Sequence, residues 1–145
     1  MKPPPKGWPR LAVSVFYDDP KAAIDWLCRA FGFEVRLKVE GDGGDIVHSE
    51  LLFGDAVVMV GSTHGKEPYQ KRFKSPKELG GSMTQTLAFF VDDCDQQYAR
   101  AVAAGAETIR EPKTDDYGDD YWVDRTCGVT DPEGHLWWFM QRIKG

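Results

Sequence analysis

The sequence has no long apolar run, little cysteine and no excess of positive charge. Its longest unbroken apolar runs are the five-residue segments AVVMV, LAFFV and LWWFM, far below the roughly 20 residues that a helix needs to cross a bilayer. The first residues, MKPPPKGWPR, contain no apolar stretch of the kind that a secretory signal requires. We therefore expect neither a membrane-spanning helix nor a signal peptide.

The three cysteines, Cys28, Cys94 and Cys127, are odd in number and far apart in the chain. This spacing excludes a disulfide-stapled scaffold and a CxxC clip, and it predicts free thiols in a reducing cytoplasm. The chain carries 23 acidic and 18 basic residues, for a net charge of −5. A negative surface repels phosphates, so we expect no nucleic-acid partner and no membrane partner.

The composition that remains is that of one folded domain. The chain has 145 residues, of which 41% are hydrophobic and 12% aromatic. That length and that apolar content are sufficient for a hydrophobic core, and they exclude bulk disorder. We expect a single domain over residues 1–145.

An internal repeat organises the chain. The segment FYDD at 16–19 recurs as FVDD at 90–93, which is 74 residues later. Each copy follows a short strand of alternating pattern and precedes a helix whose N-cap is an aspartate, Asp19 or Asp93. Gly32 and Gly105 supply the residues that stop these helices.

Three extended segments follow each helix, so each half reads β-α-β-β-β. The modules span about residues 10–61 and 83–143, and residues 62–82 link them. The predicted fold class is α+β, with two tandem βαβββ modules that form a curved mixed sheet around a ligand cleft.

Three segments, FYDDPKAAIDWLCRAFGFEV, HSELLFGDAVVMV and DPEGHLWWF, carry a resemblance to a known family. Together with the duplicated βαβββ pattern they resemble the vicinal oxygen chelate superfamily, which includes glyoxalase I, extradiol dioxygenases and bleomycin-resistance proteins. The resemblance covers residues 10–143 and is to the glyoxalase-like, bleomycin-resistance-like branch. It implies half-barrel modules with helices on the convex side, a ligand cleft between concave faces, and a homodimer whose second chain completes the cleft.

The metal positions of the superfamily do not carry metal ligands in this sequence. The resemblance places them at Ala12 and Thr86 on the first strands, and at Val58 (or Met59, if the hairpin shifts by one) and Trp138 on the last strands. Carbon-only side chains, one hydroxyl and one protonated indole nitrogen do not hold a divalent cation. We expect no metal and no cofactor.

His48 and Glu50 are the candidate catalytic residues. They lie two positions apart on one predicted strand, so their side chains share a face. Three interpretations remain open at this point: a relocated metal site or acid–base pair, a hydrogen-bonded polar patch in the cleft, or a solvated sheet face.

Aromatic residues mark the second module. Trp137 and Trp138 are neighbours and must point to opposite faces of their strand. We assign Trp137 to the core and Trp138 to the cleft, where it would stack on a ligand or else fill the cavity as core. Arg125 is expected to pair with an anionic group or with Glu50. The expected ligand-binding residues are Ser14, Phe16, His48, Glu50, Val58, Thr86, Phe90, Trp122, Arg125 and Trp138.

Two classes of function follow from these residues and the resemblance. The first is a metal-independent protein that binds and sequesters a drug or metabolite, as in antibiotic resistance of the bleomycin type. The second is a glyoxalase-like lyase or isomerase that uses Glu50 or His48 as acid–base group.

Overall fold

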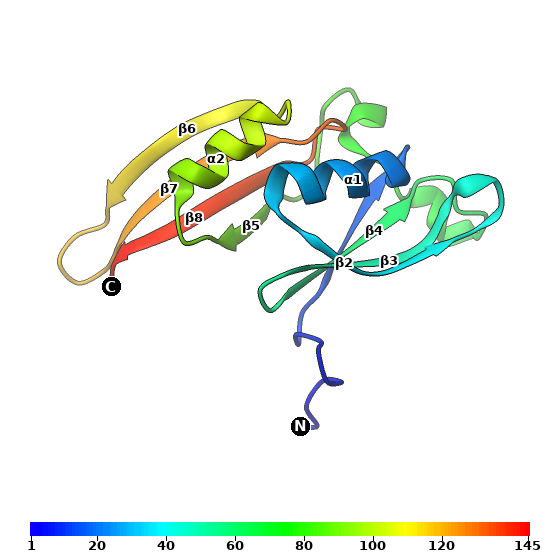
Figure 1. Ribbon diagram of the computed structural model, residues 1–145, viewed down its shortest axis with the longest axis horizontal. Helices are drawn as coiled ribbons and strands as arrows, with labels where there is room; N and C mark the ends of the chain where they lie inside the picture. The colour runs from blue at the N-terminus through cyan, green and yellow to red at the C-terminus, as the bar shows by residue number, and fades with distance from the viewer.

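The computed structural model describes residues 1–145 and contains two four-stranded sheets that lie side by side (Figure 1). The first sheet has the order β1-β4-β3-β2 and the second has the order β5-β8-β7-β6. In each sheet the first strand of the module pairs in parallel with the last, and the other pairings are antiparallel. Both sheets are open. The predicted α+β fold of two βαβββ modules is therefore confirmed.

The first module consists of β1 (Val13–Tyr17), α1 (Pro20–Phe31), β2 (Glu34–Glu40), β3 (Ile46–Phe53) and β4 (Ala56–Ser62). The second module consists of β5 (Leu87–Phe90), α2 (Cys94–Ala103), β6 (Glu107–Asp116), β7 (Val123–Thr130) and β8 (Leu136–Lys144). None of the helices is long and apolar enough to span a bilayer.

Both helices begin where the sequence predicted. The Asp19 side chain accepts a hydrogen bond from the Ala22 backbone N–H, and the Asp93 side chain accepts one from Gln96 N–H. Gly32 ends α1 in the left-handed conformation, with φ of 80°, which glycine adopts without the steric cost that a Cβ would bring. β6 extends to Asp116, and a hydrogen bond from Tyr117 N–H to Trp122 O closes the hairpin that joins it to β7.

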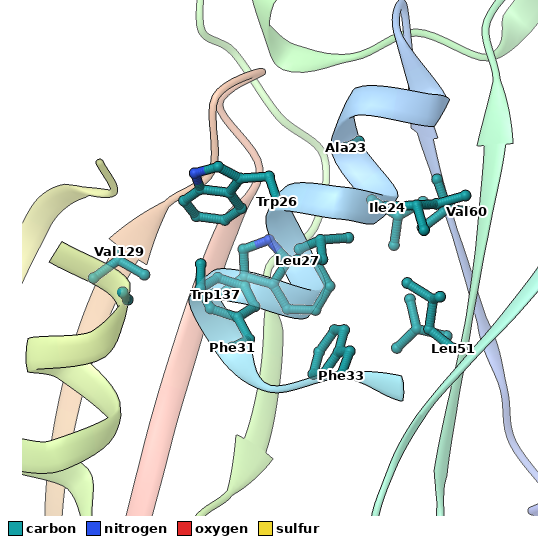
Figure 2. Packing of buried hydrophobic residues seen from close by; sticks show 14 of the residues in the cluster. Ala23, Ile24, Trp26, Leu27, Phe31, Phe33, Leu51, Val60, Val129 and Trp137 are labelled. Carbon is teal, nitrogen blue, oxygen red and sulfur yellow. The ribbon is translucent and has the colours of Figure 1, made fainter. Parts of the chain in front are cut away.

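The helices divide each sheet into two faces. α1 and α2 contact each other and lie on the same side of the two sheets (Figure 1). We call the side that they cover the helix-covered face and the opposite side the open face. The side chains of the helix-covered faces and of the helices form one core, part of which is shown in Figure 2.

Aromatic side chains join the two modules within this core. The Phe31 ring at the end of α1 lies edge-on to Trp137 and Phe139 of β8, with centroid distances of 5.3 and 5.1 Å. Trp26 donates a hydrogen bond through its Nε1 to the Ala104 carbonyl at the end of α2, at 2.8 Å. The end of the first helix therefore contacts β8 of the second sheet, and the core is shared between the modules (Figure 2).

The DPEGH segment at 131–135 forms a second connection, which we call the DPEGH clamp. The Glu133 carboxylate accepts hydrogen bonds from the backbone N–H groups of Asp18 and Asp19 at 2.7 and 3.0 Å, next to the start of α1. His135 Nε2 lies 2.7 Å from the Phe16 carbonyl of β1. A turn of the second module thus binds the strand–helix junction of the first.

Asp131 is the buried centre of the clamp. Its Oδ2 accepts hydrogen bonds from Tyr17 Oη at 2.6 Å and from Trp137 Nε1 at 2.9 Å. Its Oδ1 accepts from the backbone N–H groups of Glu133 and His135, both at 3.1 Å. One carboxylate therefore satisfies four donors from both modules, in a site from which water is excluded.

Candidate functional site

A pocket lies between the facing edges of the two sheets, which we call the seam pocket. β1 and β5 are the edge strands there, and neither is hydrogen-bonded to the other. The pocket has a volume of about 360 Å³, and twelve of its fifteen lining residues are hydrophobic. Its lining is Leu11, Val13, Ser14, Val15, Phe33, Phe53, Ala56, Val57, Val58, Gln85, Thr86, Leu87, Ala88, Phe89 and Trp137. Pockets of this size and apolar character are typical of small-molecule sites.

The open face of the first module is polar at β3. Glu50 is almost buried there, and its Oε1 lies 3.1 Å from His48 Nε2. Arg36 of β2 donates through Nε to Glu50 Oε2 at 2.7 Å. The guanidinium also lies 4.8 Å from the Trp8 ring centroid and donates to the Gly7 carbonyl at 2.5 Å, which ties the N-terminal arm to this face.

These contacts set the chemistry of Glu50. The hydrogen bond from His48 and the contact with the Arg36 guanidinium lower the pKa of the Glu50 carboxyl below its ordinary value, against the opposing effect of burial. A carboxylate whose pKa is lowered holds protons less well and is a weaker base. The polar cluster is thus a hydrogen-bonded ion pair with a half-exposed histidine at its edge.

The open face of the second module is aromatic. The Trp138 indole lies flat over Gly128 of β7, where an added Cβ would come within 2.6 Å of the ring. On its other side Trp138 pairs with Ala88 of β5, which lines the seam pocket. Trp138 therefore has a small neighbour on each adjoining strand, and one of them, Ala88, belongs to the pocket lining. Trp137, in contrast, is buried in the core, as the alternation predicted.

A guanidinium framed by aromatic rings lies further along the same face. Arg142 is 5.4 Å from the Phe90 ring centroid and 5.1 Å from that of Trp122. It donates through Nε to Asp124 Oδ1 at 2.5 Å. We call Arg142, Asp124, Phe90 and Trp122 the arginine cluster.

Eight of the ten residues expected from the sequence lie on the open side of the molecule, divided between the two modules. The set on the first module is Ser14, Phe16, His48 and Glu50. The set on or beside the second module is Thr86, Phe90, Trp122 and Trp138. Phe16 is covered by the linker, because Phe73 stacks on it at 3.9 Å.

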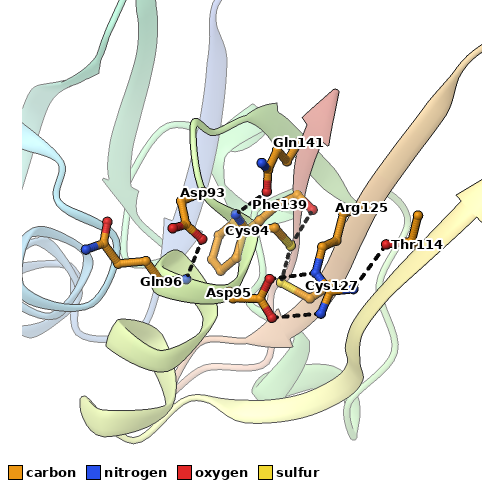
Figure 3. Close-up of polar contacts among 9 residues, drawn as sticks. All are labelled: Asp93, Cys94, Asp95, Gln96, Thr114, Arg125, Cys127, Phe139 and Gln141. Carbon is orange, nitrogen blue, oxygen red and sulfur yellow. Dashed lines mark hydrogen bonds and ion pairs between the residues drawn. The ribbon is translucent and has the colours of Figure 1, made fainter. Parts of the chain in front are cut away.

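Val58 lines the seam pocket from the helix-covered face, where it also packs in the core. Met59, the alternative if the hairpin shifts by one, pairs with Ser14 and takes the open-face position on β4. The position expected for Arg125 requires correction. Arg125 is also on the helix-covered face. It forms two hydrogen bonds to the Asp95 carboxylate of α2, at 2.6 and 2.8 Å, and does not reach Glu50 (Figure 3). An odd or even position on a strand decides its face, and the cleft-facing position expected for Arg125 has the wrong parity.

Arg36 and Arg142 are the residues that the sequence analysis missed. A signal for Arg142 was present, since it lies four positions after Trp138 on one strand and so shares its face. Arg36 carried no such signal, because a bulge in β2 between Val35 and Leu37 disturbs the alternation there.

The residues at the superfamily's metal positions do not fit a divalent cation. They are Ala12, Met59, Thr86 and Trp138, which offer one thioether and one hydroxyl between them. No group of three or more His, Cys, Asp or Glu side chains in the chain is arranged to hold a metal ion, so His48 and Glu50 lack a third ligand.

Comparisons with known proteins agree with this geometry. The model of the glyoxalase/bleomycin resistance protein/dioxygenase superfamily matches residues 11–139. An uncharacterized protein of Mycobacterium bovis is 31% identical over 138 residues, which cover 94% of this chain and 85% of that protein. The crystal structure of TioX from Micromonospora sp. ML1 has 32% identity and a TM-score of 0.69, with 92% of this chain and 95% of that chain covered.

The fosfomycin resistance protein FosX from Listeria monocytogenes shares the fold alone, at 14% identity and a TM-score of 0.63, with 92% of each chain covered. The chain belongs to the glyoxalase/bleomycin resistance protein/dioxygenase superfamily, and it lacks the metal ligands usual in that superfamily.

Proposed function

We propose that this protein binds a planar, largely apolar small molecule without a metal ion, and that it sequesters a drug or metabolite in the cytoplasm. The observation that carries the proposal is the Trp138 ring, which lies over Gly128 beside an apolar pocket of about 360 Å³. An indole face offers a large stacking surface to a flat ligand, and the pocket accepts an apolar substituent. Sequestration of a drug by bleomycin-resistance proteins of the same superfamily is a precedent for this proposal.

The alternative is a glyoxalase-like lyase or isomerase with Glu50 or His48 as acid–base group. The hydrogen bond between these two side chains favours it. The Arg36 contact counts against Glu50 as base, because it stabilises the carboxylate that would have to take up a proton. Turnover of glyoxalase-type substrates that disappears in Glu50→Gln would select this alternative over sequestration.

Replacing Trp138 tests the binding site. We expect Trp138→Ala to weaken binding of the neutral probe N-phenyl-1-naphthylamine by about 1–3 kcal/mol, because the stacking surface is lost. Gly128→Ala should weaken it too, since the new methyl group would displace the indole. The measurement is a fluorescence titration. A Trp138→Ala protein that binds normally but melts much earlier would show that Trp138 belongs to the core.

We also propose that the protein is a homodimer in which a second copy covers the open face of the first module. All of β2 is exposed, with Leu37 at 42% and Val39 at 40%. The chain's own helices cover only the opposite side (Figure 1). Leu37 and Val39 share the open face of an edge strand, where a symmetric second copy can supply a matching apolar surface.

A pair of valine substitutions tests the dimer. Val39→Lys on the open face should convert the wild-type dimer to a monomer of 16.3 kDa, because a buried unpaired charge destabilises an apolar interface. Val102→Lys on the outer side of α2, where the valine is 41% exposed, is the matched control and should stay dimeric. Sedimentation velocity reads out the mass. A monomeric wild type at micromolar concentration contradicts the proposal.

A further inference from the structure

The Arg142 guanidinium is fixed by one ion pair and still has donors available for a ligand. Asp124, whose side chain is only 10% exposed, fixes it through Nε, while the Arg142 side chain is 37% exposed. The two terminal NH₂ groups make no hydrogen bond within the chain. A guanidinium presents these two groups as a fork that matches the two oxygens of a carboxylate or sulfonate. The edge of the guanidinium formed by these two NH₂ groups therefore has no partner within the chain.

The rings of Phe90 and Trp122 frame this edge. Both lie close enough to the guanidinium for cation–π contact. The guanidinium is thus oriented by three contacts and is partly shielded from water, and both effects strengthen a charge-assisted hydrogen bond to a ligand. Arg125 provides a contrast on the opposite face. Asp95 takes two hydrogen bonds from its guanidinium and Thr114 takes a third (Figure 3).

Arg142 lies in line with the proposed binding site. Trp138, Met140 and Arg142 alternate along β8 on the open face. β8 lies next to β5 (Figure 1), and residues of β5 line the seam pocket. Four residues of extended strand separate the Cα atoms of Trp138 and Arg142 by about 13 Å. On the open face, Trp138 therefore lies next to Ala88 of the pocket lining, and Arg142 follows it along β8.

We propose that the ligand is a planar aromatic anion whose ring system stacks on Trp138 and whose carboxylate-like group binds the terminal NH₂ groups of Arg142. This inference rests on the proposed function and adds the chemical class of the ligand. The net charge of the chain is −5, so a general attraction for anions does not explain such binding, and a local cation is required.

Two probes with the same ring system test the proposal. N-phenyl-1-naphthylamine is neutral, and 8-anilinonaphthalene-1-sulfonate adds one sulfonate to it. We expect the wild-type protein to bind the sulfonate about tenfold more tightly than the neutral probe. Arg142→Met should reduce this ratio to about one. Arg125→Met removes the same charge from the opposite face of the same sheet, and its ratio should match the wild type.

The outcomes separate this inference from the proposed function. Equal binding of both probes by the wild type, or a ratio that survives Arg142→Met, overturns the anion receptor while the Trp138 site stands. Failure of both probes to bind, or binding that Trp138→Ala does not change, overturns the proposed function itself. If Arg142→Met does not fold because Asp124 is left unpaired, the double variant Asp124→Asn/Arg142→Gln removes both charges and must give the same ratio of about one.

Discussion

Asp131→Ala should lower the free energy of unfolding by about 4 kcal/mol, which is a large share of the stability of a domain of this size. The substitution leaves four donors without an acceptor: Tyr17 Oη, Trp137 Nε1 and two backbone N–H groups. A buried donor that loses its partner costs about 1–3 kcal/mol, and relaxation of the cavity recovers part of the sum. Urea denaturation followed by tryptophan fluorescence gives the value.

Two variants show whether this loss comes from the clamp. Tyr17→Phe removes one of the four donors and should cost about 1–2 kcal/mol. Asp25→Ala removes an exposed carboxylate from α1 and should change the stability by less than about 0.5 kcal/mol. If Asp131→Ala were as harmless as Asp25→Ala, the DPEGH clamp would not contribute to stability.

The protein should lose stability steeply in mildly alkaline solution. Burial raises the pKa of the Cys94 and Cys127 thiols and, together with the Asp131 carboxylate, that of the Tyr17 phenol. In the unfolded chain these groups ionise at their ordinary pKa values, so the unfolded state releases protons that the folded state keeps. Their contribution to stability is complete below about pH 8.5 and is lost as the pH rises, by up to about 1.4 kcal/mol per pH unit for each group.

We expect the free energy of unfolding to fall by about 3–6 kcal/mol between about pH 8 and about pH 10.5. Cys127→Ala should make the curve shallower in this range, whatever its stability at neutral pH, and Tyr17→Phe should flatten it only above about pH 10. The slope of unfolding free energy against pH is the measured quantity. A slope that neither substitution changes would contradict the assignment to these groups.

The sequence was sufficient for the fold because its local signals agree with one another. Asp19 and Asp93 cap the helices as predicted, since N-cap chemistry depends only on residues within one turn. Trp137 and Trp138 were assigned to the correct faces, because β8 is regular over this stretch. Patterns of this kind need no knowledge of distant parts of the chain.

Contacts between residues that are far apart in the chain could not be predicted from the sequence. Glu133 binds backbone groups more than 110 residues away, and no local pattern indicates that partner. Arg125 was expected to pair with an anionic group or with Glu50, and its partner in the fold is Asp95 of α2, which is 30 residues away in the chain. The binding roles expected for Trp138, His48 and Glu50 stay predictions that the experiments above address.

The shared core has a consequence for how the duplicated chain behaves as a folding unit. Phe31 of the first repeat packs on rings of the second, and Glu133 of the second completes the helix start of the first. Neither repeat can bury its own apolar side alone, although each has the full βαβββ pattern. We therefore expect residues 1–145 to unfold as a single cooperative unit, because each repeat supplies contacts that the other needs.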